Sequence, residues 1–121
     1  MIRTDAEAKA IARTMLRQIG NLRLSALNVN GLTFEALPNG DVTVAFLLGK
    51  GATNKIRKAT VTYNSGPDTY TVASFTMKLG WTEKGTALLP TETYSLDGVY
   101  AEQLGEVVVA AARAAGSRPR L

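Results

Sequence analysis

The sequence of 121 residues contains no cysteine and no histidine. Without cysteine there is no disulfide, no thiolate ligand for a metal and no cysteine nucleophile. Without histidine the chain also lacks the commonest metal ligand and the usual general base near neutral pH, so no Ser-His or Cys-His pair can form. Acid-base chemistry would have to use carboxylates, lysine or tyrosine. We therefore expect a protein that is not an enzyme and that binds no metal or other cofactor.

Long apolar segments are missing as well. No apolar run approaches the roughly 20 residues that span a bilayer, and the start, MIRTDAEAKA, lacks the basic and apolar regions of a signal peptide. Hydrophobic residues make up 45% of the chain and charged residues 20%, which is typical of a folded domain. We expect one domain over residues 1 to 116, a flexible basic tail over residues 117 to 121, a cytoplasmic location and no membrane partner.

Positive charge is concentrated in the first half of the chain. The formal net charge is +4; residues 1 to 60 hold nine basic and four acidic residues, against five and six in residues 61 to 121. A basic excess of this kind favours anionic partners such as nucleic acid. An excess of this size is also found on soluble domains that bind no anion, and the sequence leaves both interpretations open.

The N-terminal segment has the pattern of an amphipathic helix. Thr4 and Glu7 have the spacing of a capping box, and apolar residues then recur at helical intervals up to Ile19, before Gly20. We predict a helix over residues 5 to 19, with Arg13 and Arg17 on its outer side. These two arginines are candidate contacts to nucleic acid, or simply part of a solvated face.

Residues 22 to 90 alternate between apolar and polar side chains, which is typical of strands that are buried on one face. The strands are predicted over residues 22 to 26, 32 to 36, 42 to 48, 55 to 64, 69 to 81 and 86 to 89. Asn30-Gly31 is predicted as a tight hairpin turn, and a change of phase near Val72 and Ala73 indicates a bulge. Trp81, the only tryptophan, is predicted to pack in the core.

A second helical pattern is predicted over residues 97 to 115, with Ser95 or Asp97 as its cap. Ile11, Leu16, Leu104 and Val108 are predicted core residues of the two helices. The fold class is therefore α+β, with an N-terminal helix, an antiparallel meander of five to six strands and a C-terminal helix. Both helices are expected on one face of the sheet, because their apolar sides need a partner.

The segment GKGATNKIRKATVTYN, residues 49 to 64, raises the question of a phosphate site. Its glycines do not have the spacing of a P-loop, and a strand pattern follows instead of a helix. Its basic residues cluster beside the polar face of the predicted sheet: Lys50, Lys55, Arg57 and Lys58. This cluster predicts a nucleic-acid interface, in which Tyr63, Tyr70 or Trp81 would stack on bases.

Three motifs carry a resemblance to a known family: RQIG at the end of the first helix, DTYTV in a strand, and VYAEQL near the last helix. The chain resembles a family of small uncharacterised proteins encoded by phages, plasmids and other mobile elements. The resemblance implies a small non-enzymatic protein that binds nucleic acid, occupies a host protein or serves in a virion, and the basic loop and the polar sheet face favour a nucleic-acid-binding accessory protein. The alternatives are an inhibitor of a host protein, acting against host defence or in host takeover, or a self-assembling structural protein that forms a homo-oligomer. The family carries no assigned function, so it supplies no site residue.

Overall fold

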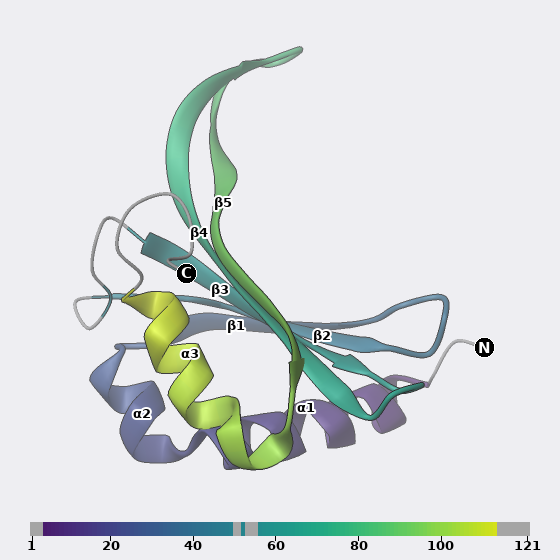
Figure 1. Cartoon of the computed structure of the whole chain (residues 1–121). Coiled ribbons are helices and arrows are strands. Elements are labelled where there is room, and N and C mark those ends of the chain that lie inside the picture. The colour runs from purple at the N-terminus through teal and green to yellow at the C-terminus, as the bar shows by residue number, and fades with distance from the viewer. Residues whose placement is uncertain (1–3, 50–51, 53–55, 114–121) are drawn as a thin grey trace.

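The computed structural model describes residues 4 to 49, 52 and 56 to 113. Its elements follow the order α1 (Asp5–Ile19), α2 (Asn21–Ala26), β1 (Asn30–Ala36), β2 (Val42–Leu47), β3 (Ile56–Asn64), β4 (Thr69–Thr82), β5 (Gly85–Val99), the 3-10 turn η1 (Ala101–Gln103) and α3 (Leu104–Ala112). The strands form one antiparallel sheet of five in the order β1-β2-β3-β4-β5. Helices α1 and α3 cover one face of this sheet (Figure 1). The predicted α+β class is confirmed, and the predicted tail at residues 117 to 121 lies outside the described residues.

Helix α1 begins and ends where the sequence predicts. The backbone nitrogen of Glu7 donates to Thr4 Oγ1 at 3.2 Å, and that of Thr4 donates to Glu7 Oε1 at 2.9 Å, which completes the capping box. The helix stops at Ile19 because Gly20 takes a φ of 97° and its nitrogen donates to the carbonyl of Leu16. Its apolar side faces the sheet, and its buried residues are Ala8, Ala12, Met15 and Ile19.

The strand predicted over residues 22 to 26 is wrong, because this segment is the short helix α2. Leu22 is 88% exposed, whereas Leu24 packs against the core and Leu27 is fully buried. The two leucines that face the core are three residues apart, which is a helical interval. The alternation of Leu22 and Leu24 therefore does not reflect a shared face.

The hairpin turn predicted at Asn30-Gly31 is also wrong, since these residues begin β1. Gly31 does adopt the positive φ that the motif favours, at 59°, but within a strand. The register of the pairing between β1 and β2 shifts between Asn30 and Thr33. Gly31 therefore lies at an irregularity in the hydrogen-bond ladder between these two strands. A hairpin turn needs a strand before it, and the segment before Asn30 is the helix α2 instead of a strand.

Strands β2 and β3 form the centre of the sheet. Val42, Val44 and Phe46 of β2 are buried under the helices and pair with alternate residues of β3, among which Ala59 and Val61 are also buried. The predicted turn at residues 38 to 41 is present, and Asn39 Oδ1 accepts from the backbone nitrogen of Asp41 at 3.0 Å. These two strands confirm the alternation read from the sequence.

The bulge predicted in β4 near Val72 is wrong, because the extra residue lies on the partner strand and the alternation of β4 continues unchanged. Tyr70 pairs with Val99 and Val72 pairs with Leu96, so β5 has one residue more than β4 between these pairs. Strand β5 continues to Val99, and the last helix accordingly begins with η1 at Ala101 rather than at residue 97. Neither Ser95 nor Asp97 caps it, because both belong to β5.

Most of the predicted core residues lie in the core. Leu104 and Val108 of α3 are fully buried, Ile11 packs against the core from the side, and Leu16 is half-buried. Trp81 contradicts its prediction: its side chain is 84% exposed. Trp81 alternates in β4 with the buried face of Val72, so it lies on the side of the sheet opposite the helices.

Candidate functional site

Strands β4 and β5 extend well past the rest of the sheet. In the described part of β3, pairing with β4 ends at Ile56 and Thr76. The pairing of β4 with β5 continues from Met77 and Pro90 to Thr82 and Gly85. We call residues 77 to 90 the arm. Figure 1 shows that it bends away from the helices and hooks at its far end.

Apolar side chains of the arm are exposed to solvent. Trp81 is 84% exposed and Leu89, on β5, is 38% exposed. Residues on adjacent strands that pair directly share a face, so Trp81 lies on the face of Met77 and Pro90, whereas Leu89 covers Gly80 on the other face. A two-stranded hairpin has marginal stability in water. A tryptophan exposed on such a ribbon is a candidate contact to a partner, because tryptophan is enriched among the residues that dominate protein interfaces.

The two edges of the arm differ in their capacity to pair. Strand β5 is the outer strand of the sheet, and Pro90 in the arm offers no N–H group along it. On the other side, residues 77 to 82 of β4 lie beyond the described pairing with β3. The β4 side of the arm therefore presents the better edge for a further strand.

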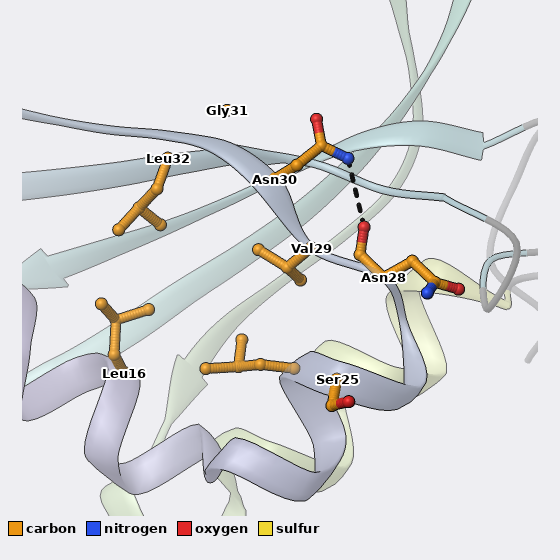
Figure 2. Close-up of a pocket in the computed structure, with 8 residues that line it drawn as sticks. Leu16, Ser25, Asn28, Val29, Asn30, Gly31 and Leu32 are labelled. Carbon is orange, nitrogen blue, oxygen red and sulfur yellow. Dashed lines mark hydrogen bonds between the residues drawn. The ribbon is translucent and has the colours of Figure 1, made fainter.

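An apolar groove lies at the opposite edge of the sheet, between the helices and β1. It has a volume of about 500 Å³ and is lined by Leu16, Leu24, Ser25, Asn28, Val29, Asn30, Gly31 and Leu32. Figure 2 shows Leu16, Val29 and Leu32 directed toward this space, and Asn30 Nδ2 donating to the carbonyl of Asn28 at 3.2 Å. None of these lining residues is charged. Leu32, at 47% exposure, and Phe34, at 40%, leave the adjoining surface of β1 apolar.

The chain reaches this groove through an unusual backbone position. Asn28 has a φ of 53°, which turns the chain from α2 into β1. Gly49 packs against this turn: its nitrogen donates to Leu27 at 3.0 Å, and a side chain on Gly49 would collide with Asn28. These contacts hold the end of α2 beside β1 and so fix the width of the groove.

The sheet face opposite the helices is polar, as predicted. Thr43 and Thr62 share a hydrogen bond of 2.9 Å, and Thr71 Oγ1 accepts from Asn64 and donates to Asp97. Lys58 also lies on this open face, with Nζ 5.9 Å from the centre of the Phe75 ring. An ammonium group at this distance is attracted by the face of the ring.

The structure separates the basic residues that the sequence groups together. Arg13 and Arg17 are on the exposed side of α1, whereas Lys58 is on the open face, so the sheet lies between them. Arg57 is exposed at an irregularity of β3, and its Nη1 donates to the carbonyl of Ile56. Lys50 and Lys55 lie outside the described residues.

The aromatic residues expected to stack on bases are also separated. Tyr70 is buried, and its ring centre lies 5.5 Å from that of Tyr63 on the helix side of the sheet. Both line a second cavity of about 440 Å³ beside α1. Within it, Tyr70 donates to Gln18 Oε1 at 2.8 Å and Tyr63 to Asp68 Oδ1 at 2.7 Å. Burial raises the pKa of Tyr70. The bond from Tyr70 to Gln18 joins the sheet to α1, and the bond from Tyr63 occupies Asp68. We therefore assign this cavity to the packing of α1 on the sheet.

The described residues contain no cluster of acidic side chains suited to a metal ion, and no helix among them is long and apolar enough to cross a membrane. The arm and the groove were not predicted from the sequence. A signal for the arm was present: residues 85 to 91 carry no charge, and Trp81 stands beside a two-residue turn between long strand patterns. No protein-family model matches the chain, and comparisons with curated proteins and with solved structures find no match.

Proposed function

We propose that the protein is a non-enzymatic, self-assembling structural protein whose copies associate through the arm. The observation that carries the proposal is the 84% exposure of Trp81 on a two-stranded extension of the sheet. Tryptophan is among the residues that contribute most to protein interfaces, and the loss of such a residue commonly costs about 2 kcal/mol of binding free energy or more. A partner that buries the indole would also stabilise a ribbon that is marginal in isolation.

This proposal agrees with the setting that the family resemblance implies. A phage or mobile element can use a small protein without catalytic chemistry as a repeated building block. Association of identical copies requires only one surface that fits another. We place this assembly in the cytoplasm of the cell that carries the element.

The test is the molar mass of the protein in solution, measured by light scattering after size exclusion at several loading concentrations. Wild-type protein is expected as multimers that dissociate on dilution, and Trp81→Ser is expected as a monomer. Tyr100→Ser is the matched control, because Tyr100 is an aromatic residue with 57% exposure that lies outside the arm. A wild-type protein that stays monomeric at every concentration would refute self-assembly and favour the alternative in which the arm binds a host protein.

A second candidate function is nucleic-acid binding on the open face, favoured by the neighbouring cations of Arg57 and Lys58 on β3. Lys58 lies over Phe75, and Thr60 and Thr62 follow it on the same face of β3 and offer hydroxyl groups to phosphate oxygens. Such binding would depend on charge and would weaken as the salt concentration rises. The salt dependence of oligonucleotide binding tests this candidate independently of assembly.

A further inference from the structure

We infer that the groove of one copy receives the arm of the next copy, so that the chains join head to tail. The inference rests on the proposed self-assembly and adds the receiving site to it. Its premise is that one chain carries both an exposed apolar extension and an apolar groove. The arm belongs to β4 and β5, and the groove lies beside β1, at the other edge of the sheet.

A chain cannot place its arm in its own groove. The arm leaves the sheet at the β4 and β5 edge and bends away from the layer of helices (Figure 1). The groove lies on the helix side, because α1 and α2 supply Leu16 and Leu24 to its lining. Three strands separate β1 from β5 in the sheet. The arm that fills the groove must therefore come from another copy.

The groove and the face of the arm that carries Trp81 are both uncharged. The groove is lined by apolar and uncharged polar residues. The face of the arm that carries Trp81 also holds Met77, Thr86 and Pro90 and has no charged residue. Lys78 pairs with Leu89 on the other face, and Glu83 and Lys84 lie in the turn at the end of the arm. Burying the uncharged face against an uncharged groove leaves no unpaired charge in the interface, which would be costly. A cavity of about 500 Å³ is also within the range that encloses ligands larger than one indole.

The backbone edges provide a second contact. Strand β1 is an edge strand, so one side of its backbone is open to a further strand in the described structure. The β4 side of the arm offers a matching edge, while Pro90 makes the β5 side unsuitable. Addition of the arm to β1 would extend the sheet by strand pairing and bring Trp81 toward Leu32 at the groove. Pairing would supply affinity, and the apolar side chains would fix the register.

An arm that binds a groove elsewhere on an identical chain forms a heterologous contact. Each copy then donates one arm and receives another, and the assembly continues until it closes into a ring or grows as a filament. This arrangement makes a specific prediction for mixtures of variants. A copy with a defective arm and a copy with a defective groove must still form one contact between them.

The experiment mixes Trp81→Ser, which retains the groove, with Leu32→Arg, which retains the arm. Leu32 is 47% exposed, so an arginine there can keep its charge in solvent while it blocks the groove. Each variant alone is expected as a monomer, with self-association weakened at least about 30-fold relative to wild type. Their mixture is expected to form a 1:1 dimer that does not grow at higher concentration.

Cysteine cross-linking provides a test that does not depend on a destabilising charge. The native chain has no cysteine, so introduced thiols react only with each other. Thr86 is exposed and pairs with Trp81, so Thr86→Cys places a thiol beside the indole and retains it. Thr86→Cys mixed with Leu32→Cys is expected to give a disulfide-linked dimer under mild oxidation. Tyr100→Cys mixed with Leu32→Cys is the control, and little product is expected from it.

The outcomes separate the two proposals. Should wild-type protein assemble while the variant mixture stays monomeric and no cross-link forms between residues 86 and 32, the pairing of arm and groove is wrong and self-assembly stands. A mixture that gives dimers of Trp81→Ser with itself would also overturn the pairing. If wild-type protein is monomeric throughout, both the assembly and its receiving site are refuted.

Discussion

The phenolic hydroxyl of Tyr70, on β4, donates a hydrogen bond of 2.8 Å to Oε1 of Gln18, on α1. This bond joins the sheet to the helix at a point where the Tyr70 side chain is buried. The hydroxyl can donate only while it carries its proton, and burial disfavours the charged phenolate. The packing of α1 on the sheet is therefore coupled to the protonation of Tyr70.

The first prediction concerns stability at high pH. Burial raises the pKa of Tyr70 above its ordinary value of 10.0 and outweighs the Gln18 hydrogen bond, which acts in the opposite direction; the negative charge of Asp68 raises it further. The unfolded chain therefore loses this proton at a lower pH than the folded protein does. The stability from Tyr70 is complete below pH 10 and is lost as the pH rises through the folded pKa. Urea titrations on both sides of this pH should show a smaller loss of unfolding free energy for Tyr70→Phe than for wild type.

The exposed Tyr100 provides the control for this prediction. Tyr100→Phe removes one phenol that lies outside the core, and it should leave the pH dependence close to that of wild type. Equal pH dependence in wild type and Tyr70→Phe would contradict the coupling. At neutral pH, Tyr70→Phe should cost about 1 kcal/mol, the usual net value of one intramolecular hydrogen bond.

The second prediction concerns the packing of α3. Leu104 is fully buried where α3 faces the sheet, so Leu104→Ala removes buried methyl groups and leaves a cavity. The expected loss is about 2 to 5 kcal/mol of unfolding free energy, measured by chemical denaturation. Leu22→Ala is the matched change at a site with 88% exposure, and it should alter stability by no more than about 0.5 kcal/mol. Similar losses in the two variants would show that Leu104 is not buried.

The third prediction concerns Ser74 on β4. Its side chain is fully buried, and its Oγ has no hydrogen-bond partner among the described residues. A buried hydroxyl without a partner costs about 1 to 3 kcal/mol of desolvation. Ser74→Ala should therefore raise the unfolding free energy by about 1 kcal/mol. The comparison is Ser65→Ala, which removes a hydroxyl that donates to Asp41 Oδ1 at 3.1 Å and should destabilise the protein. A loss of stability in Ser74→Ala would mean that the hydroxyl finds a partner.

The fold could be predicted wherever local pattern and burial agree. The capping box at Thr4 and Glu7 determines the start of α1, and the alternation through Val42, Val44 and Phe46 determines β2. In both segments the apolar spacing matches one face that is covered. Residues 22 to 26 are too short for their spacing to distinguish a helix from a strand. This segment is helical because the helix brings both Leu24 and Leu27 into contact with the core.

The candidate surfaces could not be predicted because they depend on where neighbouring elements end. Trp81 is a large apolar residue typical of a core, but β4 places it on the face opposite the helices and beyond the described pairing with β3. The groove is lined in part by α2, a segment whose apolar spacing predicts a strand. Arg13, Arg17 and Arg57 are exposed, but a count of charges does not show that Arg13 and Lys58 lie on opposite sides of the sheet.

The last prediction tests nucleic-acid binding by comparing these two sides. If the open face binds phosphates, the logarithm of the affinity for labelled oligonucleotides should fall linearly with the logarithm of the salt concentration. Replacing Arg57 and Lys58 together by alanine should reduce that slope by about 1 to 2 units and weaken all base sequences alike, because phosphate contacts do not distinguish bases. The pair Arg13→Ala and Arg17→Ala removes the same charge from α1 and should leave the slope near that of wild type. Equal effects of the two double variants would place binding on neither face in particular and indicate a response to net charge alone. Absence of binding at low salt would reject the nucleic-acid candidate and leave assembly through the arm as the function to pursue.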